Sequence, residues 1–199
     1  MTMRTIAVLP VKSFGAAKQR LTADLGEPQR LLAEQMMARV LDSLCAAQAI
    51  ERVLVVTREP AAAALAAELG ADVVDEPSLR GHSAAASRGV DRAIALGAER
   101  VLLAAGDCPL LTAGDVDDLL GRYAGRGVVI LADRHGAGTN GLLLAPPDAI
   151  APAFGPGSRE RHATLAGAAG MPWSVESIQG FAIDVDTAED LALVRSAIT

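Results

Sequence analysis

Short apolar runs rich in β-branched residues alternate with helical patterns along the chain, and this alternation limits the possible folds most strongly. The runs predicted as strands are Thr5–Val11, Arg52–Thr57, Asp72–Val74, Arg100–Ala104, Val128–Ala132, Gly141–Ala145 and Phe181–Val185. The helical patterns cover Pro28–Ala47, Pro60–Leu69, Ala84–Leu96, Ala113–Tyr123 and Thr187–Ala197, the last with a capping-box pattern of Thr187 and Asp190. Such alternation predicts an α/β fold with a mainly parallel sheet and helices on both faces.

The length and composition indicate a single domain over residues 1–199. A chain of 199 residues can bury a substantial core without disulfides or metals. Hydrophobic residues make up 51% of the chain and aromatic residues only 3%, so this core must consist largely of Ala, Val, Leu and Ile. Such a composition suits a parallel sheet covered by helices.

The charge and the cysteines argue against several kinds of partner and site. The chain has 18 Lys and Arg against 24 Asp and Glu, and this net charge of -6 offers no general attraction to nucleic acid or an anionic membrane. Cys45 and Cys108 lack CxxC spacing, which indicates reduced thiols rather than a zinc site or a disulfide framework. The first apolar run, Ile6 to Val11, is too short for a membrane span or a secretory signal. We therefore expect a cytoplasmic protein, and a homodimer stays open.

Three cations follow the first predicted strand. Ligands of open parallel sheets bind beyond the carboxyl ends of the strands, so this loop is a candidate binding site. Lys12, Lys18 and Arg20 lie within nine residues that also include Gly15, and together they could neutralise a triphosphate. Their spacing matches neither a Walker loop nor the GxGxxG pattern, and a solvated basic loop explains the charges equally well.

Carboxylates stand at two further strand ends. Asp107 follows an apolar run and precedes the turn residue Pro109, so it could hold magnesium or simply form the turn. Asp184 and Asp186 end the last predicted strand, where residues two apart point to the same face. Asp186 could instead help to cap the following helix. Three aspartates at two strand ends nevertheless favour a metal site, because carboxylates placed together without a cation would repel.

Two glycine-containing loops could bind a second anionic group. Residues 133–141 offer Thr139 with amide, guanidinium and imidazole donors, or form only a tight turn. Residues 154–162 lead into a helix predicted from Arg159, with Ser158 as its N-cap. The backbone donors of that helix could bind an anion, although an ordinary capped helix explains the pattern slightly better.

Two arginines and a histidine near the start of that helix bear on the same question. Arg159 and Arg161 could reinforce an anion site at the helix N-terminus. His162 lies one helical turn after Ser158, so it either faces the same anion or lies exposed to solvent.

Taken together and in this order, these clusters resemble those of the 2-phospholactate or phosphoenolpyruvate guanylyltransferases of deazaflavin coenzyme biosynthesis, over nearly the whole chain. The motifs that carry the resemblance are Pro10-Val11-Lys12 with Lys18 and Arg20-Leu21, Gly106-Asp107 with Pro109-Leu110, Gly138-Thr139-Asn140, Phe154-Gly155 with Ser158 and His162, and Asp184-Val185-Asp186-Thr187 with Glu189-Asp190-Leu191. The chain departs from the family at His82-Ser83, where members commonly carry a Leu-Asn-Ala pattern. How the base is read therefore stays open.

The resemblance implies a Rossmann-like nucleotidyltransferase fold of the nucleotide-diphospho-sugar transferase type, a three-layer sandwich. It implies that magnesium is held by Asp107, Asp184 and Asp186. The acid substrate would bind at Thr139, Gly155 and Ser158. The nucleotide, GTP, would bind at Pro10, Val11, Lys12, Lys18, Arg20 and Ser83, of which Lys12, Lys18 and Arg20 would also be catalytic.

The implied reaction joins GMP from GTP to a small phosphorylated three-carbon acid and releases pyrophosphate. Because the attacking phosphate is already anionic, positioning and charge neutralisation suffice without a side-chain nucleophile. Phosphoenolpyruvate, 2-phospholactate and 3-phosphoglycerate stay open as the acid, and the resemblance favours phosphoenolpyruvate. The alternatives are another nucleotidyltransferase, acting on a sugar phosphate or cofactor, and a non-catalytic nucleotide-binding regulator.

Overall fold

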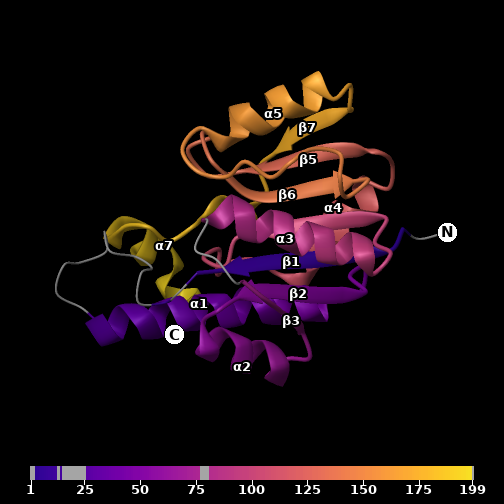
Figure 1. Cartoon of the computed structure of the whole chain (residues 1–199). Coiled ribbons are helices and arrows are strands. Elements are labelled where there is room, and N and C mark those ends of the chain that lie inside the picture. The colour runs from indigo at the N-terminus through magenta and orange to yellow at the C-terminus, as the bar shows by residue number, and fades with distance from the viewer. Residues whose placement is uncertain (1–2, 13, 15–25, 77–80, 199) are drawn as a thin grey trace.

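One sheet of seven strands runs through the part of the chain that the computed structural model describes, residues 3–12, 14, 26–76 and 81–198 (Figure 1). Its strands are β1 (Thr5–Val11), β2 (Arg52–Thr57), β3 (Asp72–Asp75), β4 (Arg100–Ala104), β5 (Gly127–Ala132), β6 (Thr139–Ala145) and β7 (Trp173–Glu176). They lie in the order β3-β2-β1-β4-β6-β5-β7. β6 is antiparallel to both its neighbours and the other pairings are parallel, which confirms the predicted α/β class with a mainly parallel sheet.

The apolar runs located most strands correctly. β1, β2 and β4 have the predicted bounds, and β3, β5 and β6 differ by one or two residues. The predicted strand Phe181–Val185 is wrong, because Gln179–Ala182 forms the short helix α6 and no strand follows it. Its apolar residues reflect core packing instead, since Phe181 and Val185 are fully buried. The sequence prediction misses β7, an edge strand whose exposed Trp173 and Val175 give no clear pattern.

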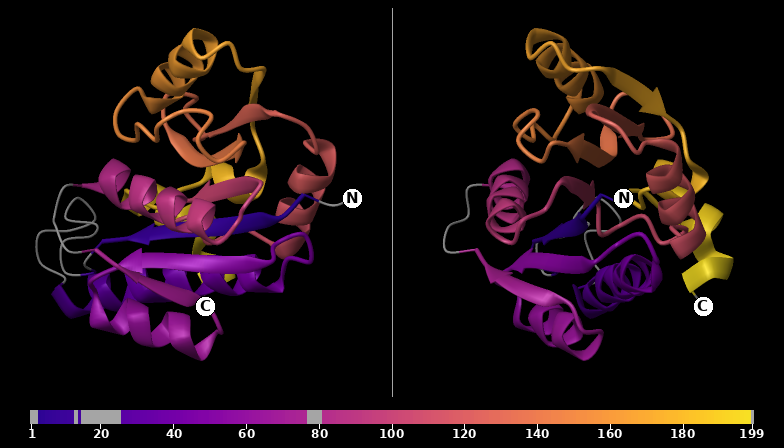
Figure 2. Two further views of the ribbon diagram at one scale, coloured as in Figure 1. Left: turned by 45° about the vertical axis from the view of Figure 1, so that its right-hand side comes forward. Right: turned by 90° about the vertical axis from the view of Figure 1, so that its right-hand side faces the viewer.

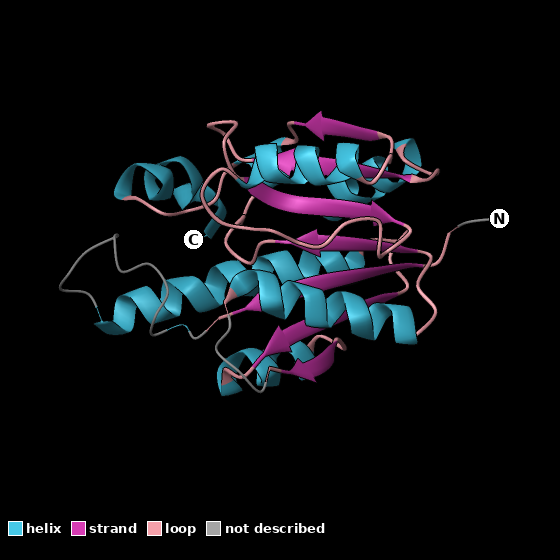
Figure 3. Ribbon diagram, turned by 45° about the horizontal axis from the view of Figure 1, so that its top comes forward, coloured by secondary structure: helices cyan, strands magenta, loops and turns pink. Residues whose placement is uncertain are grey.

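Helices cover both faces of the sheet, as predicted (Figures 2 and 3). Alternate residues of β1 separate two cores: Ala7 and Leu9 face one, Ile6 and Val8 the other. The first core includes residues of α1 (Gly26–Ala46), α2 (Pro60–Glu68) and α4 (Ala113–Arg122), and the second includes residues of α3 (His82–Ala95) and α5 (Ser158–Ala168). The last helix, α7 (Ala188–Ile198), shares a small buried cluster with α1, formed by Met36, Val185 and Val194. None of the described helices is long and apolar enough to span a membrane.

A glycine lets α3 approach β1 closely. A methyl group at Gly89 would lie 2.2 Å from Val8 Cγ1 and 3.0 Å from Val56 Cγ2, so a larger residue would force helix and sheet apart. The close packing keeps the N-terminal end of α3 near the carboxyl end of β1, where Ser83 and Lys12 line the same cleft.

Three strands direct chain segments to one edge of the sheet. β1 and β4 are parallel, so their carboxyl ends lie at the same edge. β6 runs antiparallel to β4 and therefore begins there. Since Ala104 at the end of β4 pairs with Gly141, the first two residues of β6, Thr139 and Asn140, lie just beyond β4. The segments that follow β1 and β4 and the start of β6 thus meet at one place.

Candidate active site

A cleft of about 1010 Å³ lies at this edge of the sheet. Every predicted site residue that the structure describes lines it, namely Pro10, Val11, Lys12, Ser83, Asp107, Thr139, Gly155, Ser158, Asp184 and Asp186. The other two predicted residues, Lys18 and Arg20, lie outside the described residues. The fold therefore brings the predicted nucleotide, metal and acid residues into a single cleft.

Three carboxylates converge in the cleft. Asp107 follows β4, whereas Asp184 and Asp186 follow α6, and one oxygen of each lies within 4.8 Å of the others. The backbone N–H of Val185 donates to the carbonyl oxygen of Asp107 at 3.1 Å, which joins the two segments. Val185 is fully buried while its two neighbours face the cleft, so the predicted alternation holds although the segment is not a strand.

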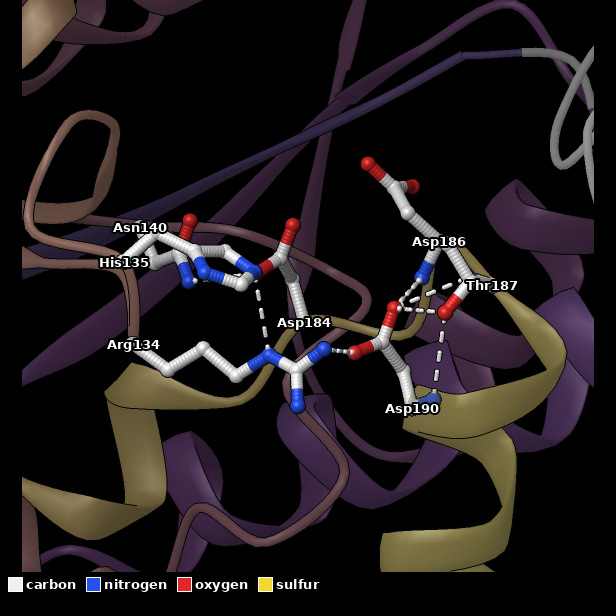
Figure 4. A network of polar contacts seen from close by, with 7 residues as sticks. All are labelled: Arg134, His135, Asn140, Asp184, Asp186, Thr187 and Asp190. Atoms are coloured by element: carbon white, nitrogen blue, oxygen red, sulfur yellow. Dashed lines mark hydrogen bonds and ion pairs between the residues drawn. The ribbon is translucent and has the colours of Figure 1, made fainter.

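Asn140 holds one of these carboxylates in place. Its side-chain Nδ2 donates to Asp184 Oδ1 at 3.1 Å (Figure 4). The same nitrogen donates to the carbonyl oxygen of Phe181 at 2.8 Å. Burial raises the pKa of Asp184 above its ordinary value, and the negative charge of Asp107 raises it further, while the bond from Asn140 lowers it. A bound cation would offset both the cost of burying the charge of Asp184 and its repulsion from Asp107. Carboxylate oxygens are the ligands that magnesium prefers. The three aspartates therefore fit a magnesium ion.

A second polar network holds the backbone of the segment that carries Asp184 and Asp186 (Figure 4). Asp190 Oδ2 accepts hydrogen bonds from the N–H of Asp186 at 3.1 Å and from the N–H and hydroxyl of Thr187, both at 2.8 Å. The N–H of Asp190 donates to Thr187 Oγ1 at 3.2 Å, which confirms the predicted capping box. On its other side, Asp190 Oδ1 lies 2.5 Å from Arg134 Nη2.

Arg134 belongs to the loop between β5 and β6, so this ion pair connects that loop to the start of α7. The backbone N–H of Arg134 also donates to the carbonyl oxygen of Ala182 at 2.7 Å. Burial alone would raise the pKa of Asp190, but hydrogen bonds from Thr187 and Asp186 and the charge of Arg134 hold it below its ordinary value. The guanidinium, which the sequence suggested as one possible donor to an external anion, thus pairs with a carboxylate of the protein itself.

The loop before α5 forms the opposite part of the cleft. Gly155 and Gly157 have φ angles of +113° and +69°, which only glycine adopts readily. Gly157, not Ser158, is the N-cap of α5, and Ser158 is the first helical residue, almost fully buried. The prediction of Ser158 as N-cap is therefore wrong by one residue, because glycine reaches the left-handed conformation that the loop needs there.

Arg161 and His162 also differ from their predicted roles. The Arg161 guanidinium donates to the backbone carbonyl oxygens of Ala153, Phe154 and Pro156, so it stabilises the loop rather than an anion. His162 is fully buried, so it is not exposed to solvent. Both of its ring nitrogens contact the protein itself: Nδ1 lies 3.1 Å from Thr139 Oγ1, and Nε2 accepts from the N–H of Ala153 at 2.9 Å.

α3 begins near the exposed Lys12, which follows β1. Gly81 is the N-cap of α3 and Ser83 lies in its first turn, where backbone N–H groups favour an anion. Burial, and secondarily the charge of Lys12, lowers the pKa of His82, which keeps this ring neutral at pH 7. Its ring packs edge-on against Phe154, with centroids 5.0 Å apart. The residues that depart from the family pattern therefore line the cleft.

The sequence suggested Arg134 and Asn140 only as possible donors to an external anion, and Asp190 only as part of a capping box. Arg134 and Asp190 are far apart in the sequence, and Asn140 is 44 residues from Asp184. No motif spacing links such pairs; the only signal was the position of Asn140 beside Thr139 at the start of a strand.

Known proteins resemble this chain over nearly its whole length. A family model described as guanylyl transferase CofC like matches residues 5–195. The phosphoenolpyruvate guanylyltransferase of Conexibacter woesei is 47% identical, over 98% of this chain and 89% of its own. The 2-phospho-L-lactate guanylyltransferase of Methanothermobacter thermautotrophicus is 34% identical, over 95% and 83%.

Solved structures show the same fold at low sequence identity. A nucleotidyl transferase from Methanothermobacter thermautotrophicus has a TM-score of 0.73 at 21% identity, over 100% of this chain and 98% of its own. The CMP:2-keto-3-deoxy-manno-octonic acid synthetase has a TM-score of 0.65 at 14% identity, over 97% of each chain. These neighbours confirm the nucleotidyltransferase fold of the nucleotide-diphospho-sugar transferase type. Since the family model covers nearly the whole sequence, the chain belongs to the CofC-like guanylyl transferase family.

Proposed function

We propose that this guanylyltransferase transfers GMP from GTP to phosphoenolpyruvate, with 2-phospho-L-lactate as the alternative acid, in deazaflavin coenzyme biosynthesis. The observation that carries the proposal is the meeting of three groups of residues in one cleft. Lys12 and Ser83 lie on the nucleotide side, the three aspartates form the cation site, and Thr139, Gly155 and Ser158 form a small polar site for the acid.

The relatives favour phosphoenolpyruvate over 2-phospholactate. Proteins named phosphoenolpyruvate guanylyltransferase are 47% and 39% identical to this chain, from Conexibacter woesei and Sphaerobacter thermophilus. The relative named for 2-phospho-L-lactate is 34% identical. Since identity tends to be higher among proteins with the same substrate, we choose phosphoenolpyruvate. We also place the protein in the cytoplasm, where its two free cysteines would stay reduced.

The reaction needs little covalent chemistry from the protein. A phosphate oxygen of the acid attacks the α-phosphorus of GTP in line, a new P–O bond forms, and the bond to pyrophosphate breaks. The chain must hold the two anions close together and oppose their charge, because they otherwise repel. Lys12 would bind the nucleotide phosphates, and Lys18 and Arg20 would share this role. Thr139 and the 155–158 turn would orient the acid.

Asp107, Asp184 and Asp186 would hold magnesium. When bound, the ion would supply charge stabilisation at the phosphates that react. Asn140 would orient Asp184 for this task, and the network of Asp190 and Arg134 would keep the backbone at Asp186 in place.

The test is pyrophosphate release by the purified protein with magnesium. Each of GTP, ATP and CTP is paired with phosphoenolpyruvate, 2-phospholactate, 3-phosphoglycerate and a panel of sugar phosphates. Release with GTP and phosphoenolpyruvate is the expected result, and the product is confirmed by mass spectrometry. Release only with a sugar phosphate, or release unchanged by D184N, would contradict the proposal.

A further inference from the structure

His162 occupies the junction of the elements that form the acid site, a site that itself rests on the proposed function. It lies one helical turn after Ser158 in α5 and contacts Thr139 at the start of β6. Its other nitrogen accepts from Ala153, two residues before Gly155. One buried ring therefore connects all three segments that carry the acid-site residues.

The backbone partner decides which ring nitrogen carries the proton. A peptide N–H can only donate, so Nε2, which accepts from Ala153 at 2.9 Å, must lack a hydrogen. A neutral imidazole then carries its hydrogen on Nδ1, and this Nδ1–H faces Thr139 Oγ1 at 3.1 Å. The Phe154 and His162 rings pack in a T-shaped arrangement, with centroids 5.2 Å apart. The contact with Thr139 thus has a direction: His162 donates and the hydroxyl accepts.

This direction fixes what Thr139 can offer to a ligand. Because the hydroxyl accepts from His162, its own hydrogen needs a different acceptor, and the described residues supply none. Thr139 is 7% exposed and lines the cleft, so that hydrogen is available to a ligand oxygen there. A hydroxyl that must donate favours an anionic oxygen, such as a carboxylate or phosphate, over a ligand hydroxyl or amine that must itself donate.

We propose that His162 is a positioning residue of the acid site, held as the Nδ1-protonated tautomer so that Thr139 presents a hydrogen-bond donor to the anionic acid. The imidazole does not touch the substrate. It acts through Thr139 and through the turn that follows Ala153.

The direct test is nitrogen NMR of the whole protein labelled with 15N-histidine. The chain has only three histidines, so the signals of His162 are assigned by their loss in H162N. A protonated Nδ1 and an unprotonated Nε2 at pH 7 are expected. Protonation of Nε2, or rapid exchange between the two tautomers, would overturn the proposal. This measurement needs no turnover, so it stands even if the protein releases no pyrophosphate and the proposed function fails.

A kinetic cycle tests the link through Thr139. T139V should raise the KM for the acid about tenfold, whereas T139S, which keeps the hydroxyl, should stay near wild type. In the H162M background, where the side chain has no hydrogen to donate to Thr139, T139V should have an effect below about threefold. The KM for GTP should change little in every variant. Effects of T139V and H162M that simply multiply, or an equal rise in both KM values, would show a merely structural histidine.

Discussion

Replacing Asp184 with Asn should stabilise the metal-free protein and remove its response to magnesium. The amide has the shape of the carboxylate, and its oxygen can still accept the hydrogen bond from Asn140. Burial and the charge of Asp107 raise the pKa of Asp184, so its ionised form is disfavoured in the folded protein. A carboxyl group with a raised folded-state pKa costs stability as the pH rises through that pKa. At pH 7 wild type bears this cost and D184N does not.

The distances in the cluster set the expected size. The carboxylate oxygens of Asp107 and Asp184 lie within 4.8 Å of each other, where Coulomb's law with a dielectric constant of about 20 gives roughly 3.5 kcal/mol. Water and salt in the open cleft screen this repulsion, so we expect a gain of about 1–2 kcal/mol, or about 2–8 °C in Tm. Magnesium at about 100 times its Kd would stabilise wild type by about 2.7 kcal/mol, which reverses the order of the two proteins.

Thermal unfolding in chelator and across a magnesium titration measures both effects, with pyrophosphate release recorded on the same samples. D118N, which removes a carboxylate on the exposed side of α4, is the matched control and should behave as wild type. If D184N were less stable than wild type in chelator, and magnesium raised the Tm of both proteins equally, Asp184 would not be a metal ligand.

Three further predictions concern groups around the cleft. R134M removes the ion-pair partner of Asp190 and should lower kcat about tenfold and the free energy of unfolding by about 1–3 kcal/mol. The control R122M breaks the more exposed ion pair with Glu176, so it should lower the free energy of unfolding by less than about 1 kcal/mol and leave kcat unchanged. Equal effects of the two variants on kcat would contradict a role of Arg134 in holding the cleft. Burial, and to a lesser extent Arg161, lowers the pKa of His162 to about 4, so stability present above its ordinary pKa should be lost as the pH falls from about 6.5 toward 4. Urea unfolding should show this loss as about 2 kcal/mol between pH 7 and pH 5 in wild type beyond that in H162N, and parallel curves would refute it. G141A would place a methyl group 2.6 Å from Leu131 Cδ1 and 2.9 Å from Phe181 Cδ1, so it should lower the free energy of unfolding, measured by chemical denaturation, by about 1–3 kcal/mol. The control G121A has open space around the added methyl group and should leave the free energy of unfolding unchanged or raise it.

The sheet was predictable where burial alone shapes the sequence. β1 and β4 are buried along their whole length, and each gives an apolar run with clear ends that match the structure. Phe181–Val185 shows the limit of the same signal, because a buried irregular segment needs apolar residues as much as a strand does. β7 shows the converse, since it pairs with β5 on one side only and needs no apolar run.

The candidate site was predictable at residues that must face the ligand, and less so at the residues that hold them. Asp184 and Asp186 were predicted to face the same side because residues two apart in a strand do so, although this segment is not a strand. The pairing survived because Val185 is buried while Asp184 and Asp186 face the cleft, so the side chains alternate there as they would in a strand. By contrast, His162 has partners 23 and 9 residues away on different elements, and no local pattern shows that their atoms meet.

The three aspartates differ in how the backbone around them is held in place. Asp107 follows a strand whose ladder fixes its position, whereas Asp184 and Asp186 lie in a segment without regular structure. Such a segment has no backbone ladder, so its geometry depends on contacts from Asn140 and from Asp190 with Arg134. Both contacts reach back to the β5–β6 loop and the start of β6, where Thr139 also lies. A change in that region should therefore disturb the cation site and the acid site together, and an isolated loss of either after R134M would argue against this coupling.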